Sequence, residues 1–246
     1  MATTIAISGK GGSGKTTLAA MMIRALLRQS AQGILAVDAD PNSCLGLTMG
    51  VENVSTVAEL REQARRKQPS EAGMDRVRTF EYGLQQAITE AKGFDLLTMG
   101  RPEGPDCYCA VNNLLRKFLD NLASAYSFVV MDNEAGMEHL SRRTTNNVDV
   151  LCIAAESSPI GLITAQRIFQ LARQLPISVK RIGVIWNRTD AEKQLNGVES
   201  FGCVPHDEAV FDSSMAGRPI FDIEEDSPAY SAVRRILERK LNLTKT

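Results

Sequence analysis

The sequence predicts an α/β fold in which a mostly parallel, twisted sheet carries helices on both faces. Short apolar segments rich in β-branched residues alternate with longer segments of helical periodicity. A glycine-rich loop separates the first strand from the first helix, and polar motifs follow most later strands. No repeat, linker or low-complexity tract interrupts the 246 residues, so we expect a single domain over residues 1–246.

The strands are predicted from short apolar runs, which are typical of a sheet that is buried on both faces. In chain order they are Thr3–Ser8, Gly33–Val37, Phe94–Met99, Ser127–Met131, Asp149–Ala155, Arg181–Trp186 and Ser200–Val204. Because the carboxyl ends of parallel strands meet at one edge, the polar motifs that follow these strands are expected to form one composite site.

The helices are predicted from apolar residues that recur three and four positions apart. Thr17–Arg28 shows this spacing and ends in arginine, which suits the negative end of a helix dipole. The polar stretch Lys67–Thr79, which contains proline and glycine, is expected to be a surface excursion. The other predicted helices are Thr56–Arg66, Glu81–Lys92 (the weakest), Ala110–Ala123, Ile160–Gln174 and Ser227–Leu241.

Composition excludes several classes of protein. The chain is 43% hydrophobic and 23% charged, with a net charge of −1, which is ordinary for a soluble domain and gives no case for a nucleic-acid partner. No apolar run approaches the length of about 20 residues that spans a membrane. The N-terminus enters a strand without a signal-peptide region, so a cytoplasmic location without stable membrane association is expected. Five cysteines in such a protein favour thiol, metal-ligand or core roles over disulfides.

The glycine-rich loop matches the phosphate-binding pattern G-x-x-x-x-G-K-[ST]. Its backbone N–H groups and the N-terminus of the following helix would bind the phosphates. Lys15 would bridge the β- and γ-phosphates of ATP, and the Thr16 hydroxyl would hold Mg²⁺. The predicted nucleotide-binding residues of the loop are Gly9, Lys10, Gly11, Gly12, Ser13, Gly14, Lys15, Thr16 and Thr17.

The same glycines allow an alternative interpretation. Gly9, Gly11 and Gly14 also spell the dinucleotide fingerprint G-x-G-x-x-G, and Asp38 ends the next strand as the acidic residue of that motif would. The pair Lys15-Thr16 argues against this interpretation, because a dinucleotide site needs neither that lysine nor a hydroxyl for Mg²⁺.

Three carboxylates are predicted around the phosphates. Asp132 follows an apolar strand, in the position that supports Mg²⁺, usually through water; the alternative is a helix cap. Asp38 and Asp40 follow the second strand, where one would orient the attacking water and the other would support Mg²⁺. The alternative for this second pair is a simple Asp-Pro turn at Asp40-Pro41.

The adenine base is expected at the end of the strand that precedes Asn187. An amide side chain donates and accepts hydrogen bonds, so it matches the edge of adenine, although a plain loop asparagine is the alternative. The segment Pro205-His206-Asp207 follows the last strand and is predicted to form the other wall of the base pocket.

These motifs together resemble the MinD/ParA/nitrogenase-iron-protein class of dimeric ATPases. The resemblance rests on the loop with its extra Lys10, on VDADP at 37–41, on Asp132 and on Asn187. It implies a homodimer closed by ATP, in which Lys10 reaches the nucleotide of the other subunit and hydrolysis reopens the dimer. Together with Lys15 from the loop motif and Asp38 and Asp40 after the second strand, Lys10 completes the set of predicted catalytic residues.

Within this class, VDADPNSCLG at 37–46, LLTMG at 96–100 and Cys107-Tyr108-Cys109 look like the CooC-type maturation ATPases. That resemblance implies nickel insertion into carbon monoxide dehydrogenase or a related nickel enzyme. It also implies a metal site made by Cys107 and Cys109 of both subunits, since four thiolates suffice for Ni²⁺ or Zn²⁺. The alternative is a pair of incidental thiols, because the pattern is short. The loop RPEGPD at 101–106 departs from the glycine-rich family pattern and leaves the client enzyme open.

Two other functions remain open at this stage. A MinD- or ParA-like organiser of a membrane or DNA partner would need a lipid-binding C-terminal helix or a basic face. We expect the apolar residues of Ser227–Leu241 to pack on the domain instead. An electron-donating reductase would need cluster cysteines after the Asp132 strand, and residues 132–145 contain none.

Overall fold

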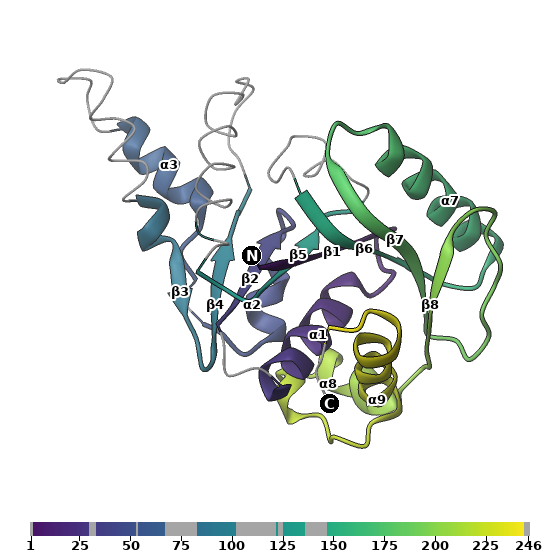
Figure 1. The fold of residues 1–246 in the computed structure, drawn as a ribbon. Helices are drawn as coiled ribbons and strands as arrows, with labels where there is room; N and C mark the ends of the chain where they lie inside the picture. Colours follow the sequence, from purple (N-terminus) through teal and green to yellow (C-terminus); the bar gives the residue numbers. More distant parts are fainter. Residues whose placement is uncertain are drawn as a thin grey trace.

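In the computed structural model, the described residues are 2–29, 33–52, 54–66, 83–101, 122, 125–135 and 147–243. Their strands are β1 (Thr3–Gly9), β2 (Ile34–Ala39), β3 (Ile88–Glu90), β4 (Phe94–Thr98), β5 (Phe128–Asn133), β6 (Asn147–Ala155), β7 (Ser178–Asn187) and β8 (Glu199–Val204). They form one sheet in the order β3-β4-β2-β5-β1-β6-β7-β8 (Figure 1). Only the β3–β4 pair is antiparallel within these residues, which confirms the predicted mostly parallel sheet.

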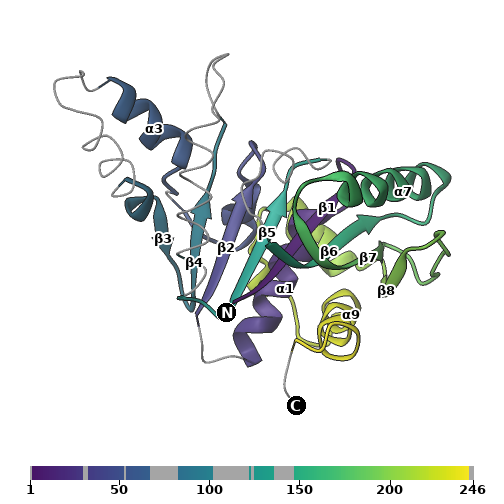
Figure 2. The ribbon, with the colours of Figure 1, turned by 45° about the horizontal axis from the view of Figure 1, so that its top comes forward.

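The helices cover both faces of this sheet. They are α1 (Lys15–Gln29), α2 (Cys44–Thr48), α3 (Val57–Arg66), α7 (Pro159–Gln174), α8 (Glu208–Met215) and α9 (Pro228–Arg235), with a 3₁₀ turn η1 (Ile220–Asp222) and a π-helical turn η2 (Ile236–Lys240). Figure 2 shows α3 and α7 on one face of the sheet and α1 and α9 on the other.

The strand side chains alternate between two cores, as the two-residue period of a strand requires. In β1, Ile5 and Ile7 pack into the cluster that contains α1 and α9, whereas Ala6 packs into the cluster that contains α7. In β7, Ile185 joins the first cluster and Trp186 the second. The apolar runs were therefore recognisable in the sequence because both faces of each strand are buried.

The prediction for residues 81–92 is partly wrong. Residues 83–86 form one helical turn, but Ile88–Glu90 is β3, which pairs antiparallel with β4. The edge of β4 offers unpaired backbone groups, and pairing with it outweighs the weak helical pattern of this segment. The sequence prediction also missed the short helices α2 and α8. The surface excursion at 67–79 and the helix at 110–123, apart from Leu122, lie outside the described residues.

The C-terminal segment packs on the domain, as predicted. Its apolar side chains are buried in the cluster with α1; they are Ala229, Tyr230, Ala232, Val233, Ile236, Leu237 and Leu241. Arg24 of α1 is itself buried. Its guanidinium carbon Cζ lies 4.3 Å from the centre of the Tyr230 ring, and its Nη1 donates a hydrogen bond of 2.9 Å to the backbone carbonyl of Ile220. Across the described part of the chain, the helices are too short or too polar to cross a bilayer.

Candidate nucleotide site

The glycine-rich loop joins the end of β1 to the start of α1, in the predicted order. Gly12 and Gly14 adopt φ angles of +80° and +85°, which L-residues with a side chain rarely adopt. The backbone N–H of Ser13 donates to the carbonyl of Lys10 at 3.1 Å, and that of Leu18 donates to the carbonyl of Gly14 at 2.9 Å. The loop therefore closes on itself and leads directly into a helix N-terminus, which is the geometry that binds phosphate groups.

Asn187, the last residue of β7, is hydrogen-bonded to this loop. Its side chain is only 6% exposed, and Nδ2 donates a hydrogen bond of 2.8 Å to the backbone carbonyl of Ser13. A Cβ atom added at Gly14 would lie 2.3 Å from the same nitrogen, so glycine is required there for space as well as for conformation. The role of Asn187 in binding adenine stays a prediction, and its contact with the loop is a function that the sequence did not reveal.

This contact predicts different costs for two glycine substitutions. Gly14→Ala combines an unfavourable φ angle with a clash against Asn187, so we expect it to lower the free energy of unfolding by about 3 kcal/mol. Gly12→Ala is the matched control, because it has a similar φ angle and open space around the added Cβ, and should cost about 1–2 kcal/mol. Urea unfolding of both variants without nucleotide measures the difference. Equal losses would show that the Asn187 contact does not matter.

The phosphate-side polar groups are buried together at the ends of β1 and β5. Asp132 lies beside Ile7 in the parallel register, and it belongs to β5 itself rather than following the strand. Thr16 Oγ1 donates to Asp132 Oδ2 at 2.6 Å. Lys15 is 7% exposed, and its Nζ donates to the carbonyl of Lys10 at 3.4 Å. The loop, the start of α1 and the end of β5 thus place a lysine, a hydroxyl and a carboxylate in one small region.

The electrostatics of Asp132 fit a divalent cation. Burial raises the pKa of Asp132 to about 7, although the hydrogen bond from Thr16 and the charge of Lys15 both act to lower it. Among the described residues, Oδ1 of this buried carboxylate finds no hydrogen-bond partner. A carboxylate oxygen next to a hydroxyl matches the oxygen ligands and bound waters that Mg²⁺ prefers.

Asp38 supports the loop that follows β2 from the inside. It is fully buried and opposite Asp132 in the sheet register. Oδ1 accepts from the backbone N–H of Asp40 at 3.2 Å, and Oδ2 accepts from that of Leu45 at 2.8 Å. Burial nevertheless raises the pKa of Asp38 to about 6. Both oxygens are therefore engaged in shaping the loop between Asp38 and Leu45.

Asp40 is more accessible than Asp38 and shapes a turn. Its Oδ1 accepts hydrogen bonds from the backbone and side-chain nitrogens of Asn42 at 2.9 and 2.8 Å. The turn that we gave as the alternative interpretation of Asp40-Pro41 is thus present. A water-positioning role for Asp40 stays a prediction. The role is chemically available, because the second carboxylate oxygen can still accept a hydrogen bond from water.

The segment after β8 lies beside Asn187, because Val204 is paired with Asn187 in the sheet. Asp207 is the N-cap of α8 and also bonds the start of α9: its oxygens accept from Ala209 N at 3.0 Å and from Ser227 Oγ at 2.6 Å. Burial raises the pKa of Asp207, but these hydrogen bonds outweigh that effect and lower it. His206 Nε2 lies 3.1 Å from a carboxylate oxygen of Glu208. The contribution of Pro205, His206 and Asp207 to a base pocket stays a prediction.

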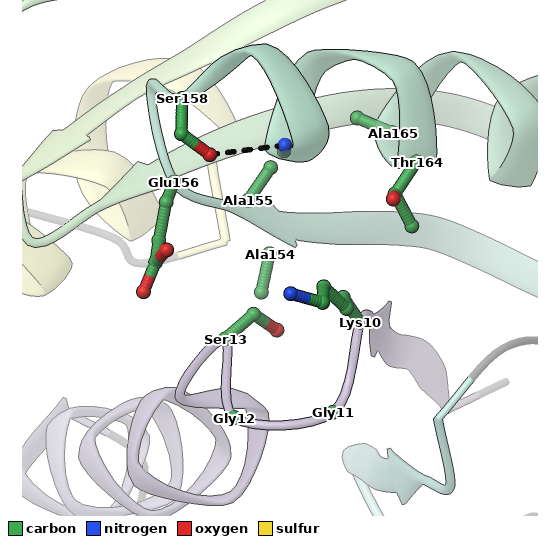
Figure 3. Close-up of a pocket in the computed structure, with 11 residues that line it drawn as sticks. Lys10, Gly11, Gly12, Ser13, Ala154, Ala155, Glu156, Ser158, Thr164 and Ala165 are labelled. Atoms are coloured by element: carbon green, nitrogen blue, oxygen red, sulfur yellow. Dashed lines mark hydrogen bonds between the residues drawn. The ribbon is translucent and has the colours of Figure 1, made fainter.

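Lys10 is the exposed lysine of the loop. Lys15 is buried, whereas Lys10 lines a pocket between the loop and the start of α7. Figure 3 shows the Lys10 ammonium and the Ser13 hydroxyl pointing into this pocket beneath Ala154. The remaining lining residues are Gly11, Gly12, Ala155, Glu156, Ser158, Gly161, Thr164 and Ala165. A lysine in this position is free to meet a group that approaches from outside the chain.

Cys107 and Cys109 lie outside the described residues, so the structure gives no geometry for the predicted metal site. In the described ranges, no group of three or more histidine, cysteine, aspartate or glutamate side chains could hold a metal ion. Cys152 is fully buried in β6 and therefore contributes to the core. Cys44 is exposed and Cys203 is half-buried.

Comparison with known proteins places this geometry in a family. The model of the CobQ/CobB/MinD/ParA nucleotide binding domain matches residues 4–220. The chain is 42% identical over 250 residues to an uncharacterised ATP-binding protein of Methanocaldococcus jannaschii, covering 97% of this chain and 98% of the relative. It is 31% identical over 260 residues to the carbon monoxide dehydrogenase accessory protein CooC of Rhodospirillum rubrum, covering 96% of each.

Solved structures show the same fold at low sequence identity. A ParA family ATPase from Chlorobium tepidum superposes with a TM-score of 0.72 at 20% identity, covering 96% of this chain and 98% of that one. The septum site-determining protein MinD of Pyrococcus horikoshii, complexed with Mg-ADP, superposes with a TM-score of 0.69 at 22% identity, covering 99% and 98%.

Proposed function

Because this chain belongs to the CobQ/CobB/MinD/ParA nucleotide-binding family and is an ATP hydrolase of the MinD/ParA class, we propose that it is a homodimeric metallochaperone. In this proposal it binds Ni²⁺ or Zn²⁺ between subunits in the cytoplasm and supports nickel insertion into carbon monoxide dehydrogenase or a related enzyme. The observation that carries the proposal is 31% identity to CooC along 96% of the chain, combined with Cys107 and Cys109 in the sequence.

The nucleotide chemistry divides among the residues of one subunit. Lys15 would neutralise the β- and γ-phosphates, and Thr16 with Asp132 would hold Mg²⁺, directly or through water. When bound, Mg²⁺ supplies positive charge where negative charge develops on the phosphate oxygens. Asp40 would orient the attacking water, because it is the more accessible of the two carboxylates after β2. Asn187 and residues 205–207 would bind the adenine end.

The second subunit would complete each site through Lys10. The exposure of Lys10 and its position in the pocket beside α7 support this role. A lysine that served the nucleotide of its own loop would be buried, as Lys15 is. A cation supplied from another chain can stabilise the charge of phosphoryl transfer, as an arginine finger does. ATP binding would thereby be coupled to dimer closure.

The metal would be held by Cys107 and Cys109 of both subunits, which together supply four thiolates. Four thiolates close a tetrahedral Zn²⁺ site or a square-planar Ni²⁺ site. Opening of the dimer after hydrolysis would separate the two pairs and release the metal to the client enzyme.

Metal stoichiometry tests the proposal directly. We expect the wild-type protein to carry about half a Ni²⁺ per chain in a dimer peak on gel filtration, since one Cys₄ site is shared by two chains. Cys107→Ala should lose this metal and still bind ATP, because the cysteine lies outside the phosphate-binding motif. Cys44→Ala is the matched control, since Cys44 is an exposed free thiol outside the proposed metal pair. Full nickel binding by Cys107→Ala would contradict the metal site and leave the ATPase intact.

The alternative function is a MinD- or ParA-like organiser of a membrane or DNA partner, which the shared fold makes worth testing. The burial of the apolar side chains of α9 and η2 favours the metallochaperone, because those residues contribute to the core. Co-sedimentation with liposomes or DNA in the presence of ATP separates the two functions, and ATP-dependent binding to either would favour the alternative.

A further inference from the structure

The helix α8 exposes large apolar side chains to solvent. Phe211 is 50% exposed and Met215 is 74% exposed, while Phe221 of the adjacent η1 is 39% exposed. The opposite side of α8 carries Ser213, which is 4% exposed. A short helix that buries a serine and exposes phenylalanine and methionine reverses the usual pattern of a surface helix. Such an arrangement is typical of a surface that another molecule covers.

Carboxylates interleave with these apolar residues. Glu208, Phe211, Asp212 and Met215 are spaced at i, i+3, i+4 and i+7, which places them along one side of α8. Asp222 follows Phe221 in η1 and is also exposed. We refer to these residues, namely Glu208, Phe211, Asp212, Met215, Phe221 and Asp222, as the α8 surface.

The charge of this region differs from that of the whole chain. Residues 208–226 contain six carboxylates and a single basic residue, Arg218, whereas the net charge of the protein is only −1. Two of the carboxylates have partners in the fold, since Glu225 pairs with Arg28 and Glu208 lies against His206. Asp212 and Asp222 are exposed on the α8 surface itself. The negative field there would attract a cationic partner and repel DNA or an anionic lipid surface.

The α8 surface is held in place by contacts that do not use its exposed groups. Asp207 caps α8 and bonds the start of α9 through Ser227, while the backbone N–H of Arg218 donates to the carbonyl of Ser213 at 2.9 Å. Figure 1 shows α8 next to α1 and α9, on the face of the sheet opposite α7. The surface is therefore preorganised and separate from the Lys10 pocket.

We propose that the α8 surface is a docking site for a basic, amphipathic segment of a partner protein. Lysine or arginine side chains of that segment would meet Glu208, Asp212 and Asp222, and its apolar side chains would cover the phenylalanines and Met215. Methionine and aromatic side chains suit this use, because they supply contact area that adapts to the partner. The inference does not depend on the metal site, since it rests only on exposure and charge of α8 and η1.

Fluorescence anisotropy with the full-length protein tests the proposal. The probe is a labelled helical peptide of about 18 residues in which leucine and lysine follow an amphipathic pattern. We expect Phe211→Ser combined with Met215→Ser to weaken its binding about tenfold or more. Asp212→Lys combined with Asp222→Lys should weaken it similarly and reduce its dependence on salt. Because all four side chains are exposed, the variants should keep the circular dichroism spectrum of the wild type.

Two controls and one further measurement make the result decisive. Ile163→Ser combined with Leu171→Ser changes apolar side chains that are 54% and 41% exposed on α7, and it should leave peptide binding unchanged. A scrambled peptide of the same composition should bind about tenfold more weakly. In the wild type, the peptide should also slow hydrogen exchange of residues 206–222.

Several results would overturn the docking site. They are equal binding of the scrambled peptide, an equal loss in the α7 variant, and unchanged hydrogen exchange in residues 206–222. A fourth is a wild-type dimer, seen by sedimentation without nucleotide, that the Phe211 and Met215 substitutions abolish; this would show that a second copy of the chain covers the surface.

Discussion

Lys10→Ala is expected to bind ATP with nearly unchanged affinity and to hydrolyse it about a hundredfold more slowly or worse. The reason is the division of labour between the two lysines of the loop. Lys15 is buried against the loop, where we propose that it serves the nucleotide of its own chain, whereas Lys10 is exposed beside α7. Removing Lys10 therefore leaves the phosphate cradle intact and removes the charge proposed to reach the other subunit.

Two measurements and a control variant separate this result from a general loss of folding. ATP affinity by fluorescence of a labelled analogue should match that of the wild type, and sedimentation with saturating ATP should show a monomer. Lys193→Ala serves as the control for an exposed lysine outside the site and should behave like the wild type. A Lys10→Ala protein that still dimerises with ATP and hydrolyses it at the wild-type rate would remove the intersubunit role.

Asp132→Asn is expected to stabilise the nucleotide-free protein while it abolishes most of the hydrolysis. The pKa of Asp132 is raised by burial from 3.8 to about 7. Without metal, ionising this carboxylate in the folded state is therefore costly at neutral pH, with an upper bound of roughly 4 kcal/mol. Asparagine keeps an oxygen that can accept the hydrogen bond from Thr16 and carries no charge.

The sign of the pH dependence follows from the direction of the shift. The folded protein binds a proton more tightly at Asp132 than the unfolded chain does, so the wild type loses stability as pH rises from about 4 to about 7. In urea unfolding with a chelator present, the free energy of unfolding of Asp132→Asn should exceed that of the wild type by roughly 2–4 kcal/mol at pH 8. This difference should shrink toward pH 4. With Mg²⁺-ATP, the variant should hydrolyse about a hundredfold more slowly, because it has lost charge at the phosphates.

Asp207→Asn provides a control in which the expected change in the free energy of unfolding at pH 8 has the opposite sign. The pKa of Asp207 is lowered by its hydrogen bonds in the fold, so its ionised form contributes stability above the unfolded pKa and loses that contribution as pH falls. Asp207→Asn should therefore be less stable than the wild type at pH 8. If both variants changed stability in the same direction at pH 8, the electrostatic explanation for Asp132 would be wrong.

The fold class was predictable because its evidence is local. Both faces of each central strand are buried, so the sequences of β1 and β7 contain continuous apolar runs. The phosphate-binding loop was recognisable because its glycines, Lys15 and Thr16 lie within one short segment. Local evidence failed for β3, since only its antiparallel pairing with β4 makes that weakly helical segment a strand.

The sequence by itself predicted which side chains carry the phosphate chemistry and at which edge of the sheet they meet, and the structure brings Thr16 and Asp132 together at that edge. Only the tertiary structure decided what several of them contact. Asn187 bonds the carbonyl of Ser13, 174 positions away in the chain, and Asp207 bonds Ser227, 20 positions away. No local pattern encodes such pairs, because they form only when packing brings distant strand and helix ends together and buried polar groups must find partners. That requirement gives Asn187 a contact that supports the loop and makes Asp207 a cap that holds two helices, and the sequence revealed neither contact.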